Sequence, residues 1–494
     1  MIRLKWKTLL CTASALALLL TGSGRADAAR PQDEPEKGTI AAASTELNTE
    51  TKDEAASYEA EPVEAETLYI GLSFDTGAVT DAVFRNVEGR GFRIGSLDEE
   101  RQFHPLAESD NPTLIIRPER NIYVMLDEVF PTREEAVARA QRYLGKVILL
   151  DGSYRVIVGP LRDHGEVAYT IGWYGLSASV WQEDCLAAYD GTGRLIDLYI
   201  HADELAVEPI SDGKAQTEYA QEQYYGSFLL RRWEGNRLTV INAVHIEDYV
   251  KGVIPYEMNP AWPMEALKAQ AVCARTYAAY NLNAYAEEYG FDLTNDTESQ
   301  VYRGTLGADA VTDAAVDATA GQYVRYRGQL CEVYYFSSDG GATEDGAHIF
   351  GSGQPYLAGR TDPFEQAREN AVMKWQRWRS GEEIAERLRM QGFSVGRIVS
   401  VEPEYSELGN VTAMNYTDLD GVCVRLEGRD GYSFLALDSA RFRVEADDYG
   451  FSFIGRGWGH NCGMSQWGAN AMAAVYGYSA EDIIRFYFTG AYIG

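Results

Sequence analysis

The chain has 494 residues, of which 74 are acidic and 44 are basic, so its formal net charge is −30. This acidic excess argues against a protein that binds nucleic acid or an anionic membrane surface, because both of those partners are polyanions. The six cysteines form no close-spaced pairs and therefore define neither a disulfide framework nor a zinc ribbon.

The N-terminus has the pattern of an export signal. Three basic residues precede an apolar run from Leu9 to Leu20, and Ala26-Asp27-Ala28 supplies a small-x-small cleavage site. The apolar run is shorter than the roughly 20 residues that span a bilayer, which favours a cleaved signal peptide over residues 1–28 rather than an uncleaved anchor. The mature chain is therefore expected to be extracytoplasmic, either secreted or associated with the cell wall.

Residues 29–66 are expected to form a disordered acidic linker. Between Pro31 and Glu66 there are eleven acids and two lysines, a net charge of −9, and almost no aromatic residues. Short apolar runs with glycine turns follow, and they predict a small β unit over residues 67–112.

The next segment has an alternating pattern of strand, helix and two strands. Thr132 and Glu135 have the spacing of a capping box, and the expected strands lie at 121–126, 147–150 and 154–158. This βαββ pattern, followed by Val158-Gly-Pro-Leu161, resembles the SPOR domain, a small module that binds peptidoglycan glycan. The module is expected within residues 113–206, and the alternative is an α+β module with a purely structural role.

From Tyr225 the sequence is dense in strand patterns and motifs. The runs SFLLRRW and RLTVINAVHIEDYVKGVIPYEM lead to a chain reversal at Glu257, between Pro255 and Pro260. Pro263 suits the first turn of a helix, which is expected to continue to about Tyr289. The alanines of this helix permit close packing, and shorter helices are expected at 310–320 and 382–390.

Glu257 is the first candidate for chemistry. It has Tyr256, Met258 and Trp262 around it, and apolar surroundings keep a carboxylic acid protonated to higher pH, as a general acid requires. The glycine-rich segment Gly455–Ala469 is the second candidate, because its composition suits a loop that approaches a ligand closely.

Four blocks in order, VIPYEMNPAWPMEALKAQAVCARTYA, TESQVYRG, YYFSSDGGATED and GRGWGHNCGMSQWGA, resemble the SpoIID/LytB family over residues 217–494. Members of the SpoIID type are lytic transglycosylases that cut peptidoglycan strands from which the stem peptides have been removed. The LytB branch is described as enhancing a cell-wall amidase. The resemblance therefore implies two classes of function.

The resemblance places Glu257 at the family's catalytic glutamate. A lytic transglycosylase works with one carboxyl group, which protonates the glycosidic oxygen and then accepts the proton of the muramic acid 6-hydroxyl as that oxygen closes on C1. No water is consumed, so the second carboxylate of ordinary glycosidases is not needed. The alternative interpretation of Glu257 is a carboxylate that caps the following helix.

The other candidate residues are expected to bind or orient glycan. Arg275 suits a lactyl carboxylate or an acetamido oxygen through its planar fork, although an ion pair with a local acid is the alternative. Gln300 and Tyr302 would share one face of a strand and line a cleft. The full set expected to contact substrate is Arg275, Gln300, Tyr302, Ser337, Gly340, Gly341, His460, Ser465 and Gln466.

No metal and no cofactor is expected. Some family members have a metal-ligating histidine at the position of Phe336, which has no ligand atom. His460 and Cys462 invite a protease or zinc interpretation, but a nucleophile and its base usually come from separate segments. Asn461 stands where the family usually has glycine, and asparagine is the least costly replacement if that position has a positive φ.

The sequence thus predicts a multi-domain α+β protein with a strand-rich SpoIID-like domain, in which one long helix follows the catalytic glutamate. The expected activity is cleavage of the β-1,4 bond between N-acetylmuramic acid and N-acetylglucosamine, with 1,6-anhydromuramic ends as products. The expected partners are denuded peptidoglycan strands and a cell-wall amidase, and not nucleic acid. The alternatives are a non-catalytic LytB-type regulator and a hydrolase with a second carboxylate from Asp296, Glu298, Asp339 or Glu344.

Overall fold

The computed structural model describes residues 58–494, except for positions 64, 99–100, 151–152, 183, 201–203 and 368–373. The predicted signal peptide and nearly all of the predicted acidic linker lie outside the described residues. The chain is α+β, as predicted, and clusters into two compact units. We call Val63–Asn259 with Asn281–Asp313 the N-terminal unit. We call Pro260–Tyr280 with Ala314–Gly494 the C-terminal unit, to which the described residues up to Pro62 also belong. Among the described residues, no helix has both the length and the apolar character needed to cross a membrane.

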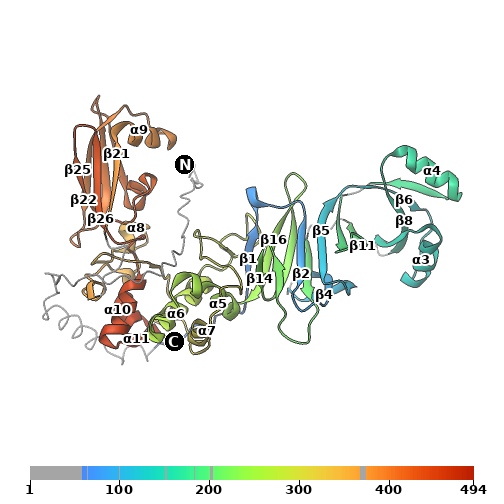
Figure 1. Ribbon diagram of the computed structural model, residues 1–494, viewed down its shortest axis with the longest axis horizontal. Coiled ribbons are helices and arrows are strands. Elements are labelled where there is room, and N and C mark those ends of the chain that lie inside the picture. Colours follow the sequence, from blue (N-terminus) through green and yellow to red (C-terminus); the bar gives the residue numbers. More distant parts are fainter. Residues whose placement is uncertain are drawn as a thin grey trace, which may run out of the picture. The chain divides into compact units, whose positions relative to one another are not determined.

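Two large sheets form most of the N-terminal unit (Figure 1). The seven-stranded sheet has the order β17 (Leu293–Thr294), β1 (Thr67–Ser73), β16 (Arg237–His245), β15 (Ser227–Trp233), β12 (Glu204–Pro209), β3 (Phe92–Leu97) and β4 (Phe103–Ser109). The six-stranded sheet has the order β11 (Leu195–Ile200), β10 (Cys185–Asp190), β5 (Thr113–Glu119), β2 (Ala82–Asn86), β13 (Thr217–Tyr219) and β14 (Glu222–Tyr224). The ring centroids of Phe84 on β2 and Phe228 on β15 are 4.8 Å apart, so apolar faces of the two sheets meet.

A smaller antiparallel sheet is inserted between β5 and β10. Its strand order is β7 (Lys146–Leu150), β8 (Ser153–Leu161), β6 (Ile122–Leu126) and β9 (Ala178–Trp181), and its helices are α3 (Arg133–Ala140) and α4 (His164–Tyr174). The predicted start of α3 is confirmed, because Thr132 Oγ1 accepts a hydrogen bond from the N–H of Glu135 at 3.4 Å. The predicted βαββ pattern is thus continued by a second helix and a fourth strand, and we call residues 122–181 the inserted module.

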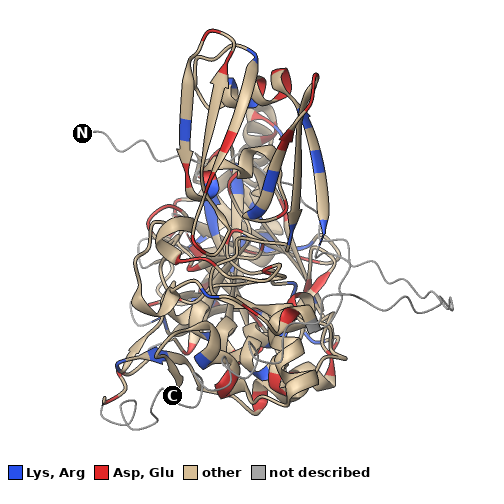
Figure 2. Ribbon diagram, turned by 90° about the vertical axis from the view of Figure 1, so that its left-hand side faces the viewer, with Lys and Arg blue, Asp and Glu red and all other residues tan. Residues whose placement is uncertain are grey.

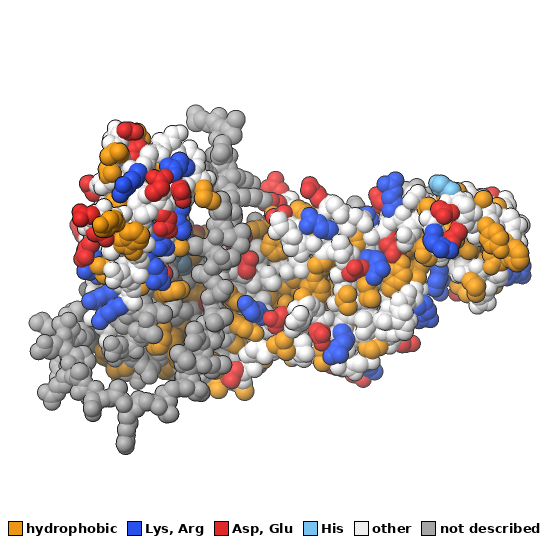
Figure 3. Space-filling view, turned by 45° about the horizontal axis from the view of Figure 1, so that its top comes forward, with side chains coloured by type: hydrophobic (Ala, Val, Ile, Leu, Met, Phe, Trp, Pro, Cys, Tyr) orange, Lys and Arg blue, Asp and Glu red, His pale blue; other side chains and the backbone are white. Residues whose placement is uncertain are grey.

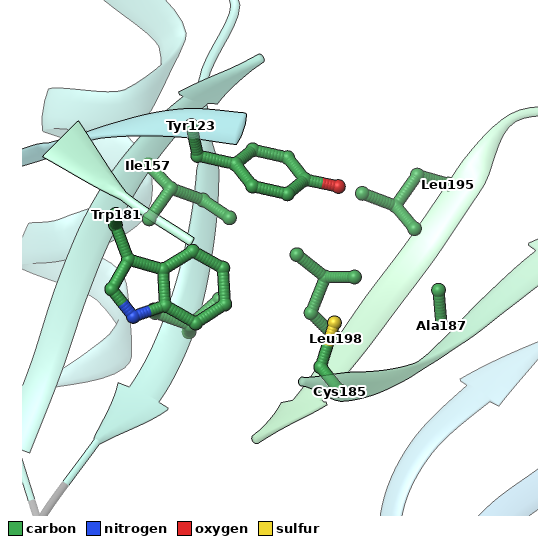
Figure 4. Packing of buried hydrophobic residues seen from close by; sticks show 8 residues of the cluster. Tyr123, Ile157, Trp181, Cys185, Ala187, Leu195 and Leu198 are labelled. Carbon is green, nitrogen blue, oxygen red and sulfur yellow. The ribbon is translucent and has the colours of Figure 1, made fainter. Parts of the chain in front are cut away.

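An apolar cluster joins the inserted module to strands β10 and β11 (Figure 4). Its core consists of Tyr123, Ile148, Ile157, Trp181, Cys185, Ala187, Leu195 and Leu198, each at most 8% exposed. Burial of this surface holds the module against the six-stranded sheet through the hydrophobic effect.

Helix α5 (Ile246–Glu257) follows β16 directly, in a segment whose sequence pattern predicts strand and turn. Apolar residues recur there at helical spacing, and all are buried: Ile246, Tyr249, Val250, Val253 and Ile254. Two poor helix formers, Gly252 and Pro255, obscure that period in the sequence. The chain reversal expected at Glu257 therefore begins one residue later, after the helix has ended.

The C-terminal unit is built around α6 (Met264–Tyr280), which packs against α10 (Gln466–Tyr476) and α11 (Ala480–Tyr487). The alanines of α6 are buried, as its sequence predicts. The predicted extension of this helix to Tyr289 is wrong, because Asn283 has a left-handed φ of 63° and its N–H donates to Asp292 Oδ1 at 3.0 Å. The remaining helices are α7 (Ala310–Asp317), which spans the boundary between the units, α8 (Gly346–Ile349) and α9 (Gly381–Met390).

Small sheets complete the C-terminal unit, and Figure 2 shows basic residues on several of its strands. Two three-stranded sheets have the orders β21 (Trp375–Ser380), β26 (Gly450–Arg456), β25 (Arg441–Ala446) and β22 (Ile398–Tyr405), β23 (Val411–Asp418), β24 (Cys423–Glu427). A third has the order β19 (Gln329–Leu330), β18 (Val324–Tyr326), β28 (Tyr492–Ile493), and β20 (Tyr335–Phe336) pairs in parallel with β27 (Met464–Ser465). This last pair brings two of the four sequence blocks together.

Candidate active site

Glu257 is the last residue of α5 and is half-buried. Tyr256, before it, is 38% exposed, whereas Met258, after it, is buried. The N–H of Met258 donates to the carbonyl of Ile254 at 2.9 Å, which closes the last turn of the helix. Glu257 is therefore partly accessible to solvent and follows an exposed residue in the chain, which a general acid for a polymeric substrate needs.

The block that contains Gln300 and Tyr302 packs against α5 and forms hydrogen bonds with residues of α5 and β16. The Tyr249 hydroxyl donates to Gln300 Oε1 at 3.0 Å, and the Tyr302 hydroxyl donates to Asn242 Oδ1 at 2.9 Å. The Tyr249 and Tyr302 rings lie 4.9 Å apart, and the Tyr302 ring is so close to Gly252 that a Cβ there would lie 2.5 Å from it. This network fixes the helix whose end carries Glu257.

These contacts change the interpretation of Gln300 and Tyr302. The predicted strand over this block is absent from the structure, and both residues lie in a loop. Gln300 is 2% and Tyr302 is 1% exposed, so the Tyr302 ring faces α5 and not a sugar. Their direct contact with substrate stays a prediction, and their burial favours a positioning role.

Arg303 is a residue of this region that the sequence did not single out. Its guanidinium carbon lies 5.8 Å from the centroid of the Tyr256 ring, at the exposed end of α5. A cation over an aromatic face is attracted by the ring quadrupole. Alternate residues of a strand point to opposite faces, so a strand that directs Gln300 and Tyr302 into a cleft would direct Arg303 away from it. The predicted strand therefore did not identify Arg303 as a candidate.

Arg275 belongs to the C-terminal unit and is fully buried in α6. Its guanidinium nitrogens donate to the carbonyls of Ala271, Gln322 and Val316 at 3.4, 3.2 and 3.3 Å. Val316 lies in the last turn of α7, where a cation interacts favourably with the negative end of the helix dipole. This environment suits a structural tie between α6 and α7 better than contact with a substrate carboxylate.

The loop Ser337–Gly341 has the tight geometry that its sequence predicts. Gly340 and Gly341 have φ values of 68° and 117°. A Cβ on Gly340 would lie 2.8 Å from Arg456, so only glycine fits. The positive φ expected of Asn461 is also confirmed, at 66°, and its Nδ2 donates to the carbonyls of Asp339 and Ala342 at 2.9 and 3.2 Å.

Strands β20 and β27 bring Ser337 and Ser465 together. The Ser465 hydroxyl lies 3.5 Å from the carbonyl oxygen of Ser337, and the N–H of Trp467 donates to that same carbonyl at 3.0 Å. Ser465 is buried and caps α10, and Gln466 is its first residue and is 6% exposed. Of the predicted site residues Ser337, Ser465 and Gln466, only Ser337 is half-buried and so retains access to a ligand.

His460 is held as a neutral imidazole. Its Nε2 donates to the carbonyl of Tyr335 at 3.0 Å, and its Nδ1 accepts from the N–H of Cys462 at 3.2 Å. Burial lowers the pKa of His460 to about 3, and the charge of Arg429 adds to this effect. Burial likewise raises the pKa of the Cys462 thiol, so neither a thiolate nor a free basic nitrogen is available for a protease mechanism.

Three buried carboxyl groups lie together at the Ser337–Gly341 loop, and one of them, Asp339, belongs to the loop itself. Asp339, Asp362 and Glu365 each place one oxygen within 4.8 Å of the others, a spacing that suits a shared proton or a hard cation. Burial and the charges of Glu365 and Asp362 raise the pKa of Asp339 well above its usual range, so a proton suffices to relieve the repulsion. Phe336, where some relatives have a metal-ligating histidine, is buried and offers no ligand atom.

The predicted site residues therefore divide between the two units. Glu257, Gln300 and Tyr302 belong to the N-terminal unit. The C-terminal unit contains Arg275, Ser337, Gly340, Gly341, His460, Ser465 and Gln466.

Comparisons with known proteins select the same regions. The family described as SpoIID, stage II sporulation protein, matches residues 234–326, which include α5, α6 and the block of Gln300 and Tyr302. Stage II sporulation protein D of Bacillus subtilis is 32% identical over 271 residues, which cover 51% of this chain and 75% of that protein. An uncharacterized protein of Brachyspira hyodysenteriae is 35% identical over 277 residues, 54% of this chain and 71% of its own length. The amidase enhancer of Bacillus subtilis is 28% identical over 287 residues, 49% of this chain but only 39% of that protein.

Proposed function

The chain belongs to the SpoIID family of stage II sporulation proteins, and on that premise we propose that it is a peptidoglycan lytic transglycosylase. The bond cleaved is the β-1,4 bond between N-acetylmuramic acid and N-acetylglucosamine, and the product has a 1,6-anhydromuramic end. The observation that carries the proposal is the position of Glu257, half-buried at the end of a helix that a buried hydrogen-bond network holds in place.

In the proposed reaction Glu257 acts twice. As an acid it gives its proton to the glycosidic oxygen, which leaves as the hydroxyl of N-acetylglucosamine. As a carboxylate it then accepts the proton of the muramic acid 6-hydroxyl, whose oxygen forms the new bond to C1. The proton given to the glycosidic oxygen is replaced by the proton of the 6-hydroxyl, so the reaction needs no water and regenerates the acid form of Glu257.

The other residues take supporting roles in this proposal. Gln300 and Tyr302 fix α5 and hence the direction of the Glu257 carboxyl group. The half-buried Ser337, on the loop that carries the third sequence block, supplies a hydroxyl group for the glycan. The two ring nitrogens of His460 are held by Tyr335 and Cys462, so His460 offers its half-buried ring as a wall of the site. We further propose that the protein is exported, acts in cell-wall remodelling, including sporulation, and takes denuded strands as substrate.

The activity is tested by mass spectrometry of denuded glycan strands after incubation with wild-type protein and with Glu257→Gln. Anhydromuramic ends are expected from the wild type alone. The matched control is Glu265→Gln, which changes another carboxyl group, on α6, that accepts from Lys268 at 2.8 Å. Intact strands with a folded wild-type protein would contradict the proposal.

The same experiment in isotopically labelled water separates lyase from hydrolase, because only hydrolysis incorporates the label. Two of the carboxylates considered for a hydrolase, Asp339 and Glu344, are buried. A third, Asp296, accepts from the Thr294 hydroxyl and from the N–H of Glu298, both at 2.9 Å. Burial makes Asp339 and Glu344 unfavourable for activating water on a sugar, whereas Asp296 and the fourth candidate, Glu298, are exposed.

A second candidate function is enhancement of a cell-wall amidase without catalysis. The similarity to a protein named amidase enhancer favours it. Addition of Glu257→Gln to a wall amidase and its substrate tests this function. Stimulation equal to that by the wild type would indicate a regulator, whereas loss of stimulation would tie it to cleavage.

A further inference from the structure

A groove of about 710 Å³ lies within the C-terminal unit, and Gly455 and Arg456 of the fourth sequence block form part of its lining. Strands β21, β25 and β26 and the turn between β22 and β23 line it. Its charged lining residues are all basic: Lys374, Arg441, Arg443 and Arg456. Basic and acidic side chains are interspersed over the face shown in Figure 3, and the whole chain carries −30 charges, so an all-basic groove is unusual here.

Two of these cations are available to a ligand. Arg456 and Lys374 are exposed, and neither has an acidic partner or a side-chain hydrogen bond within the described part of the chain. The other two are held in place. Arg441 donates to the carbonyl of Leu408 at 2.7 Å, and Arg443 pairs with Glu445 at 2.9 Å.

The positive charges of the groove are not balanced by acidic residues among the described residues that line it. Burial lowers the pKa of Arg441 and the positive charge of Arg456 adds to this effect, whereas Asp339 and Glu344 oppose it. Two guanidinium groups that repel one another are stabilised by an anion between them. The planar fork of arginine suits a carboxylate, and the half-exposed ring of Tyr405 offers a face for a sugar.

The groove also adjoins a loop of the proposed site. Arg456 follows Gly455 at the end of β26 and lies against Gly340, whose missing Cβ makes room for it. A glycan strand that contacts the Ser337–Gly341 loop therefore has basic groups beside it.

We propose that this groove binds the free lactyl carboxylates of a denuded peptidoglycan strand, an inference that rests on the proposed function. Removal of a stem peptide by an amidase converts the lactyl amide of each muramic acid into a carboxylate. A denuded strand is thus a regular polyanion, whereas the lactyl group of a peptide-bearing strand is uncharged. Arg275, the residue expected from the sequence to hold this carboxylate, is fully buried among backbone carbonyls, and the exposed cations of the groove take its place.

The test is equilibrium binding of a denuded tetrasaccharide to the full chain with Glu257→Gln, so that the ligand is not cut. In this background Arg456→Gln and Lys374→Gln are each expected to weaken binding about threefold, and the double variant about tenfold, because each removes one solvent-accessible charge contact. Arg456→Lys should retain most of the affinity. Arg397→Gln is the matched control, since Arg397 is exposed, lies outside the groove and is expected to leave binding unchanged.

The ligand chemistry is tested with three other probes. Neutral chitotetraose and a peptide-bearing muramic tetrasaccharide should bind the parent protein more weakly than the denuded one, and neither should respond to Arg456→Gln. Tighter binding of a glycerol phosphate polymer would contradict the assignment of the ligand as a carboxylate. Unchanged affinity of the double variant for the denuded tetrasaccharide would contradict the proposal that this groove binds the strand. Because the assay needs no cleavage, these outcomes are independent of whether the wild type forms anhydromuramic ends.

Discussion

Burial divides the candidate residues into those that can touch a glycan and those that hold the site together. Glu257 is half-buried next to the exposed Tyr256, whereas Tyr302 and Arg275 are almost completely enclosed. A side chain with no accessible surface can act only through its neighbours unless the fold opens. The catalytic proposal therefore rests on Glu257, and the enclosed residues are assigned to positioning.

The role of Tyr302 can be tested by Tyr302→Phe, which keeps the ring and removes the hydroxyl. The change leaves the buried Asn242 Oδ1 without this donor, which should lower the free energy of unfolding by about 1–3 kcal/mol. Denaturant unfolding measures this loss. A positioning role also predicts a lower turnover rate with little change in glycan affinity.

Tyr256→Phe is the matched control, because it also removes a tyrosine hydroxyl, but from an exposed ring at the end of α5. We expect it to change stability by less than about 0.5 kcal/mol. If Tyr302→Phe instead left stability intact and weakened glycan binding, Tyr302 would contact substrate, as its sequence block suggested.

Sequence reasoning predicts which residues belong to the candidate site, but it does not predict which of them are buried. The four blocks contain Glu257, the glycine pair and Asn461, and the backbone angles of Gly340, Gly341 and Asn461 follow from residue type. The burial of Arg275 and Tyr302 does not follow, because it depends on which distant segments cover them. The groove of Arg441 and Arg456 was missed for the same reason, since its lining comes from separate strands.

At the scale of single elements, α5 illustrates how local preference and packing compete. Gly252 lies in the middle of this helix, where glycine costs about 1 kcal/mol relative to alanine. A Cβ at this position would lie 2.5 Å from the Tyr302 ring and 2.8 Å from the carbonyl oxygen of Gly304. The glycine is therefore retained for close packing, and its poor helix propensity is the reason that the helix was not predicted.

Gly252→Ala should consequently destabilise the protein despite the better helix propensity of alanine. Overpacking typically costs about 1–3 kcal/mol, which exceeds the gain of about 1 kcal/mol from propensity. Thermal or denaturant unfolding measures the balance, and activity should fall as the end of α5 shifts.

Gly172 provides the control for this substitution. It lies within α4, and a Cβ there would meet no atom within 4 Å. Gly172→Ala should therefore stabilise the protein by about 0.5–1 kcal/mol. Equal effects of the two substitutions would contradict the packing explanation.

The elements that the sequence predicted well are those with an uninterrupted period or a clear start. Strands β15 and β16, helix α9 and the start of α3 at Thr132 belong to this group. The end of α6 was placed nine residues too late, because the left-handed Asn283 depends on the distant carboxylate of Asp292. Propensity over a short window contains no information about such a contact.

At the scale of the molecule, the sheets join strands that are far apart in the sequence. Strand β1 pairs with β16 from Thr67 opposite His245 to Ser73 opposite Val240, and β12 pairs with β15. No local pattern in one sequence indicates these partners. The family resemblance begins at residue 217, but two strands of that region, β15 and β16, have partners that lie before it.

These pairings predict opposite outcomes for two deletions. A chain of residues 217–494 lacks β1 and β12, which leaves the edges of β15 and β16 unpaired and their apolar faces exposed. We expect this fragment to aggregate or to unfold without cooperativity. Replacement of residues 120–184 by Asn-Gly removes only the inserted module, and Glu119 already lies opposite Cys185 in the β5–β10 pair, so the cut ends can be joined by a two-residue turn.

The chain without the module should therefore keep both large sheets and unfold in one cooperative transition, as circular dichroism during thermal unfolding can measure. Its stability should be somewhat lower, because the deletion uncovers Cys185, Ala187 and Leu198, which pack against the module. A stable, cooperative fragment 217–494 would mean that β1 and β12 are dispensable and that the family region folds alone. If the chain without the module instead failed to unfold cooperatively, the six-stranded sheet would require the apolar contacts that the module makes with β10 and β11. The two deletions therefore distinguish strand pairing from packing of the module as the source of stability.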